Sequence, residues 1–137
     1  MYIEPVAELI KRHEGLRLKP YRCTEGKLTI GYGRNIEDNG ISLYEAEQML
    51  YNDIQKCYTD LEKIPCWKRL DEVRKAVLLD MCFNIGITRL KTFKKMLAAL
   101  ELGAYNRAAK EMLDSKWAKQ VKSRATELAD IMVKGVL

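Results

Sequence analysis

The chain has 137 residues, of which 47% are hydrophobic and 31% charged, and its formal net charge is +5 at pH 7. This composition is typical of one soluble globular domain that buries a core without metal or disulfide support, and it excludes a disordered chain. No apolar run approaches the roughly 20 residues that a membrane span requires. The positive charge favours an anionic partner, such as nucleic acid, an anionic membrane surface or an acidic polymer.

The N-terminal segment and the cysteines bear on the cellular compartment. Glu4, Pro5 and Glu8 interrupt the apolar stretch that a signal peptide would need, so we expect synthesis and folding in a cytoplasm. No pair of the four cysteines has CxxC spacing, so we expect free thiols in a reducing compartment and no zinc site. Cys82 lies in an apolar helical run typical of a core, whereas only Cys23 lies in a turn-rich polar stretch.

The first predicted element is a helix over residues 3–13, followed by Gly15 as a natural stop. Its apolar residues recur at the spacing of one helical face: Ile3, Val6, Leu9 and Ile10. Residues 16–36 then read as a short β-hairpin, because apolar residues alternate with Thr29 and Gly31 and residues 24–27 have the composition of a turn.

Helical patterns occupy the rest of the chain. Ser42 and Glu45 have capping-box spacing at the start of a helix over residues 42–62, and Pro65 marks a break. A central helix is predicted over about residues 71–84, and its run "AVLLDMCF" is apolar nearly all round apart from Asp80. Three further helices are predicted: one capped by Thr92 that ends at Gly103, one over residues 104–113, and one from Ser123 to just before Gly135.

These elements predict an α+β fold in which a small β-hairpin lobe is inserted after the first helix and packs on a mostly helical bundle. We expect a single domain over residues 1–137. Within it, residues 13–41 form the hairpin lobe, residues 42–62 a connecting helix and residues 63–137 the helical lobe. The sequence contains no repeat, linker or low-complexity segment.

The hairpin stretch "HEGLRLKPYRCTEGKLTIGYGRN" contains the side chains that are candidates for catalysis. Glu14 precedes Cys23 by nine residues, Thr29 follows six residues later, and "IGYG" completes the string. A glutamate at a helix end is weak support for catalysis when it stands alone. The whole string, however, resembles the phage-type lysozyme family, which has Glu, then Asp or Cys, then Thr at this spacing.

The resemblance extends over nearly the whole chain, in order. "SLYEAEQMLYNDI" is similar to the connecting helix of that family, and "LDEVRKAVLLDMCFNIG" to its central helix with a Phe-Asn-x-Gly ending. "SKWAKQVKSRA" is similar to its tryptophan-containing turn, which is followed by a helix with an arginine. The resemblance implies a lysozyme-like fold and a muramidase of a phage or prophage. Such an enzyme hydrolyses the β-1,4 bond between N-acetylmuramic acid and N-acetylglucosamine, with inversion.

Roles for individual residues follow from the resemblance. Glu14 would be the general acid, which partial burial would keep protonated near neutral pH, while Arg124 would hold its carboxylate and oppose protonation. Thr29 would help to position the attacking water. Gly33 would let the backbone approach a sugar closely, and Asn84 could line the cleft or simply cap its helix. No metal or organic cofactor is implied.

Cys23 stands where better-known members of the family have aspartate. A thiol with an ordinary pKa near 8.5 is mostly neutral at pH 7, although Arg22 beside it could favour the thiolate. Three interpretations stay open: a thiolate base or nucleophile, a smaller neutral group that orients water, or a structural residue. Glu25, a rival carboxylate at the predicted hairpin tip, reads as solvated, and both Phe83 and Trp117 are expected in the core.

Two rival functions are weighed against lysozyme activity. One is a peptidoglycan-binding relative that kept the fold and lost its chemistry at Cys23. The other is a basic helical nucleic-acid binder, which the spread of basic residues among acidic ones disfavours. We expect a monomer that acts on wall peptidoglycan, without nucleic acid or stable membrane insertion. It would wait in the host cytoplasm and reach the periplasm or wall through a separate holin-type lesion.

Overall fold

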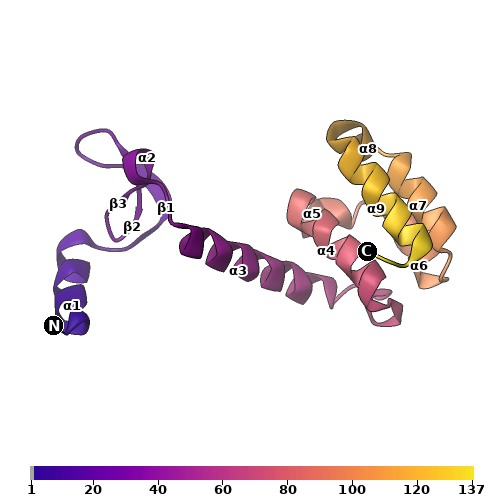
Figure 1. Ribbon diagram of the computed structural model, residues 1–137, viewed down its shortest axis with the longest axis horizontal. Helices are drawn as coiled ribbons and strands as arrows, with labels where there is room; N and C mark the ends of the chain where they lie inside the picture. Colours follow the sequence, from indigo (N-terminus) through magenta and orange to yellow (C-terminus); the bar gives the residue numbers. More distant parts are fainter. Residues whose placement is uncertain (1) are drawn as a thin grey trace. The chain divides into compact units, whose positions relative to one another are not determined.

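The computed structural model describes residues 2–137 and divides into two compact units (Figure 1). The first unit ends at Gln48 and the second begins at Met49, so the boundary falls inside the continuous helix α3 (Leu43–Leu61). A small antiparallel sheet follows the first helix and the remainder is helical, which confirms the predicted α+β class. The expectation of one domain over residues 1–137 stays a prediction.

The first unit contains the predicted helix and hairpin, with a third strand added. Its elements are α1 (Ile3–Glu14), β1 (Arg17–Arg22), β2 (Leu28–Gly31), β3 (Arg34–Asn35) and the single turn α2 (Ile36–Asn39). The strands form an antiparallel sheet in the order β1-β2-β3. The apolar face predicted for α1 is exposed, because none of its residues is buried. Neither β3 nor α2 was predicted, since elements this short have no periodicity to detect.

Polar contacts join the sheet to the start of α3. The predicted capping box is confirmed: the Ser42 amide donates to Glu45 Oε1 at 2.8 Å, and the Glu45 amide donates to Ser42 Oγ at 3.1 Å. The same carboxylate accepts two hydrogen bonds from the Arg34 guanidinium, at 2.9 and 2.7 Å. The arginine, followed by the Ser42 amide, lowers the pKa of Glu45 to about 2. One carboxylate thus ties β3 to the first turn of α3.

The second unit is a bundle of short helices that follows α3. They are η1 (Trp67–Arg69), α4 (Glu72–Ile85), α5 (Ile87–Leu90), α6 (Lys94–Glu101), α7 (Tyr105–Leu113), α8 (Lys116–Val121) and α9 (Ser123–Lys134). The predicted central helix, the 104–113 helix and the final helix are confirmed, and Asp71 caps α4. Figure 1 shows α7 and α9 side by side, in agreement with their extensive contacts. No helix within residues 2–137 has the length and apolar character to cross a bilayer.

Two predictions at the helix ends are wrong. Thr92 does not cap α6, because its hydroxyl donates backwards to the Arg89 carbonyl at 2.6 Å and α6 begins at Lys94. Phe83 is not in the core, since 43% of it is exposed. It follows the buried Cys82 by one position, and successive helical residues point about 100° apart.

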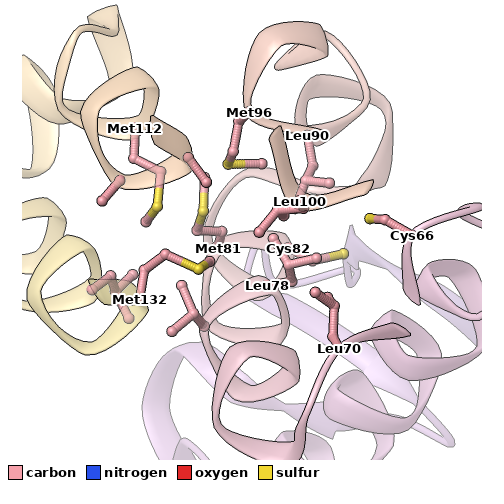
Figure 2. Packing of buried hydrophobic residues seen from close by; sticks show 14 of the residues in the cluster. Cys66, Leu70, Leu78, Met81, Cys82, Leu90, Met96, Leu100, Met112 and Met132 are labelled. Atoms are coloured by element: carbon pink, nitrogen blue, oxygen red, sulfur yellow. The ribbon is translucent and has the colours of Figure 1, made fainter. Parts of the chain in front are cut away.

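The core of the second unit surrounds α4. Leu78 and Met81 on this helix are both fully buried. Figure 2 shows methionines from four helices converging on one region of the core: Met81, Met96, Met112 and Met132. Methionine side chains are unbranched and adaptable, so they fill the irregular space between short helices. Trp117 is also buried, as predicted, with its ring edge-to-face against Phe93 at 6.2 Å between centroids.

Arg74 links the start of α4 to the end of α9. Its Nε donates to the Met132 carbonyl at 2.8 Å, and a terminal nitrogen donates to the Val133 carbonyl at 3.0 Å. Its guanidinium also lies 3.9 Å from the centroid of the Tyr105 ring. Carbonyls in the last turn of a helix have no partner within the helix, so Arg74 satisfies two of them and closes the bundle.

We predict that Leu78→Ala lowers the free energy of unfolding of the second unit by about 2 to 5 kcal/mol, because it removes a fully buried side chain and leaves a cavity. Leu79→Ala is the matched control, since Leu79 is only half-buried and its loss should cost less. Both tryptophans, Trp67 and Trp117, lie in this unit, so a denaturant titration followed by tryptophan fluorescence measures it. Equal costs at positions 78 and 79 would contradict the assigned core face of α4.

Candidate active site

Glu14 is the last residue of α1, and two contacts hold this helix end against the turn between β2 and β3. The Glu14 carboxyl group lies on the face of Gly33 where any other residue would have its Cβ; a Cβ built there would be 2.9 Å from Glu14 Cδ. Lys11 Nζ, one turn earlier, lies 5.6 Å from the centroid of the Tyr32 ring. The position of the carboxyl group therefore depends on a glycine at position 33.

Cys23 lies at the start of the tight turn that joins β1 to β2. Its amide donates to the Lys27 carbonyl at 3.0 Å, and its own carbonyl accepts from the Gly26 amide at 2.8 Å. Gly26 has a φ of +79°, a conformation that side chains with a Cβ rarely adopt. The turn predicted over residues 24–27 is thereby confirmed, and it fixes the backbone on both sides of the thiol.

The environment of Cys23 favours the thiolate. Its pKa is lowered from its ordinary value, first by a hydrogen bond from the backbone of Lys27, then by one from the backbone of Glu25, and further by the Thr29 hydroxyl. Hydrogen bonds to the charged form favour that form. The expected contribution of Arg22 is not found, because this side chain donates to the Gly26 carbonyl at 2.9 Å and pairs with Glu37 at 3.4 Å.

Thr29 is a buried polar residue in the middle strand, with 3% of its surface exposed. It lies opposite Tyr21 on β1 and Asn35 on β3, so both neighbouring strands hold it. Its hydroxyl donates to the Lys27 carbonyl at 2.9 Å. Because the hydroxyl has only one hydrogen, it must rotate away from the Lys27 carbonyl to donate to a Cys23 thiolate.

The structure brings the predicted hairpin residues together in two pairs within the first unit. Cys23 contacts Thr29, and Glu14 contacts Gly33. The partial burial expected for Glu14 is not observed, because the residue is exposed at the end of an exposed helix. Glu25 is exposed, as the sequence predicts for the hairpin tip.

The two other predicted binding residues belong to the second unit. Asn84, in the last turn of α4, is exposed, and its Oδ1 accepts a 2.7 Å hydrogen bond from Trp117 Nε1. Arg124, near the start of α9, pairs with Asp80 at 2.7 Å from Nε to Oδ1 and also donates to the Asp80 carbonyl at 3.3 Å. Within its own unit, Arg124 is therefore positioned by an acidic residue of the central helix.

Sequence reasoning missed a cavity of about 480 Å³ in the second unit. Residues from α5 to α8 line it, and four of them are basic: Arg89, Lys94, Lys95 and Lys116. Phe93 and Trp117 supply aromatic surface, while Glu111 and Asp114 add two carboxylates. The sequence gives little sign of this cavity, because α5 and α8 are too short to predict and the lining side chains come from four separate helices.

The α+β fold and the hairpin with its helix-end carboxyl group, thiol and hydroxyl define a lysozyme-like glycoside hydrolase. A family model described as phage lysozyme matches residues 11–130. The chain belongs to this family, is a lysozyme-type enzyme and has peptidoglycan as its substrate.

Similar proteins come from phages and from a eukaryote. An endolysin of Acyrthosiphon pisum secondary endosymbiont phage 1 is 36% identical, over 90% of this chain and 85% of the relative. Probable T4-type lysozyme 1 of Dictyostelium discoideum is 27% identical, over 98% of this chain and 97% of the relative. The pre-baseplate central spike protein Gp5 of Enterobacteria phage T4 is 31% identical over 96% of this chain, which spans only 28% of that protein.

We predict that Gly33→Ala lowers lytic activity about 10- to 100-fold, because the added methyl group displaces the Glu14 carboxyl group from its position. Gly40→Ala is the matched control. Gly40 also has a positive φ, +61°, but a Cβ there meets no atom within 4 Å. Turbidity assays on permeabilised cells, with equal amounts of folded protein, measure the difference. Equal losses in the two variants would indicate that backbone strain, and not the contact with Glu14, is responsible.

Proposed function

We propose that the chain cleaves the β-1,4 bond between N-acetylmuramic acid and N-acetylglucosamine, with Glu14 as general acid and the Cys23 thiolate as general base. Support comes from the hairpin, where backbone N–H groups of Lys27 and Glu25 lower the pKa of the Cys23 thiol. A thiolate is an anion, like the aspartate of better-known family members, and it can accept a proton from water. Thr29, buried beside the thiol, would help to orient that water.

The proposed reaction needs one proton donor and one proton acceptor. Glu14 donates its proton to the glycosidic oxygen as the bond to the sugar carbon breaks. Water attacks that carbon from the opposite face and gives its proton to the Cys23 thiolate, so the product forms with inversion. Proton exchange with solvent then returns Glu14 to the acid and Cys23 to the thiolate.

Substrate binding is proposed to involve Gly33, Asn84 and Arg124 together with the basic cavity of the second unit. Residues 49–137 contain 17 Lys and Arg against 11 Asp and Glu, so the positive charge of the chain is concentrated there. Peptidoglycan contains carboxylates on its sugars and peptides, and a positive surface attracts such a polymer. Asp80 neutralises part of the charge of Arg124, which makes this residue better suited to positioning than to strong ion pairing.

The biological setting is also a proposal. We propose a phage or prophage lysis enzyme that works as a monomer and accumulates in the host cytoplasm. It would reach the wall through a membrane lesion made by a separate holin-type protein. The endolysin named above, which aligns over most of its own length, supports this setting.

Glu14→Gln should nearly abolish lysis while preserving the fold, because an amide has no acidic proton to donate. Loss of one general acid typically costs about 10²- to 10⁴-fold in rate. Glu25→Gln is the control, since Glu25 is an exposed carboxylate in the same hairpin and its loss should have little effect. Turbidity loss of permeabilised Gram-negative cells measures both variants. Activity of Glu14→Gln above about a tenth of wild type, at matched melting temperature, would exclude Glu14 as the acid.

The same preparations distinguish the rival functions. A peptidoglycan-binding relative without catalysis would sediment with purified walls and release no reducing sugar. A nucleic-acid binder would retard DNA in a gel at low salt, with the effect lost as salt rises. We expect wall binding with release of reducing ends in the wild type, wall binding alone in Glu14→Gln, and no DNA shift that survives physiological salt.

Cys23 variants test whether the site needs an anion. We expect Cys23→Asp to be active, Cys23→Ser weakly active and Cys23→Ala strongly impaired. In the wild type, kcat/KM should fall as the pH drops through the lowered pKa of the thiol, at a midpoint below 9.0. Cys23→Asp should move this limb to lower pH, because a carboxyl group has an ordinary pKa near 4. An alanine variant as active as the wild type would show that Cys23 is only structural.

A further inference from the structure

A second pair of cysteines lies away from the hairpin, in the second unit. Cys57 on α3 and Cys82 on α4 line the same cavity, which has a volume of about 540 Å³. Asp53, Lys56 and Asp60 from successive turns of α3 also line it, so the cavity is polar on that side. The lysozyme reaction proposed above uses neither thiol.

The two thiols differ in burial and contact each other. Cys82 is 2% exposed, and Figure 2 shows its side chain leaving α4 in a different direction from that of Met81. Cys57 is half-buried. Burial raises the pKa of Cys82 to about 12, assisted by its hydrogen bond to Cys57 and by the charges of Cys57 and Asp60. Cys82 therefore keeps its proton, and the half-buried Cys57 is the more accessible of the two sulfur atoms.

We propose that Cys57 and Cys82 form a dithiol site that closes to a disulfide when it meets a low-molecular-weight disulfide such as oxidised glutathione, joining α3 to α4. Two features support this: both cysteines line one cavity, and the two thiols are in contact. The proposal does not rest on the catalytic role of any hairpin residue.

The reaction balances in two exchange steps. The Cys57 thiolate attacks one sulfur of oxidised glutathione, forms a mixed disulfide and releases one glutathione thiolate. With Cys57 no longer a neighbouring anion or acceptor, only burial and the charge of Asp60 still disfavour the Cys82 thiolate. Cys82 then loses its proton to solvent in the cavity, attacks the Cys57 sulfur and displaces the second glutathione. Two cysteine thiols are oxidised, and one glutathione disulfide is reduced to two thiols.

The link would change the stability of the second unit. It closes the chain from residue 57 to residue 82, and a closed loop of this size restricts the unfolded chain substantially. It also fixes the C-terminal half of α3, which packs on the core through Cys57 and Leu61, to the central helix. A protein made in a reducing compartment would thus become more stable on entering an oxidising one.

Peptide mapping and thermal unfolding of the full chain test the proposal. After incubation with oxidised glutathione, we expect a peptide that contains Cys57 joined to Cys82, with the mass of two lost hydrogens and no bound glutathione. The melting temperature followed by tryptophan fluorescence should rise by about 5 to 15 °C relative to the reduced protein. Dithiothreitol should reverse both changes.

Matched variants test whether Cys57 and Cys82 cause the cross-link and the rise in melting temperature. Cys57→Ser, at the less buried position, should abolish both the cross-link and the shift in melting temperature. Cys23→Ser should preserve both, because Cys23 lies in the hairpin turn of the first unit. Glutathione that stays attached to Cys57, a cross-link between Cys66 and Cys82 instead, or a shift that persists in Cys57→Ser would each overturn the proposal.

Discussion

Among the described residues of this lysozyme, apolar side chains are buried only in the second unit. This uneven burial determines which interactions stabilise each of the two units. All buried apolar side chains among the described residues lie between Leu61 and Met132. They lie around one face of α4, which contributes Val77, Leu78, Met81 and Cys82 to the core. In residues 2–48, by contrast, the one buried side chain is polar, that of Thr29. The unit that holds the hairpin is therefore organised by hydrogen bonds and ion pairs.

This polar organisation supports the proposal that the Cys23 thiol takes the place of a carboxylate. An aspartate is an anion at neutral pH without help, whereas a thiol needs its pKa lowered. The tight turn after Cys23 lowers the pKa of the thiol, because it directs the amides of Glu25 and Lys27 toward the sulfur. These two hydrogen bonds come from the backbone and require no particular side chain. Gly33 has a comparable role for Glu14, since the missing Cβ leaves room for a carboxyl group. In both cases the backbone conformation, and not a neighbouring charge, sets the environment of the side chain.

The errors made from the sequence share a cause. The sequence suggests that Arg22 could favour the thiolate of its neighbour Cys23, but this long side chain donates to the Gly26 carbonyl and pairs with Glu37. Thr92 was expected to cap the following helix and instead bonds to the carbonyl of the preceding turn. Phe83 was expected in the core because its neighbours are apolar. Each of these outcomes depends on which groups lie within reach in three dimensions, and local spacing contains little information about that.

The sequence by itself determined the α+β class, the long helices and the capping box at Ser42, and it singled out Glu14, Cys23 and Thr29 as candidate catalytic residues. These features repeat at short, regular spacing, and local backbone geometry follows directly from such spacing. The tertiary structure alone decided that the Cys23 thiol receives backbone N–H groups, that Gly33 makes room for Glu14 and that Cys57 meets Cys82. These contacts join residues that are far apart in the chain or that point in directions set by the turn, so they exist only once the strands and helices have packed.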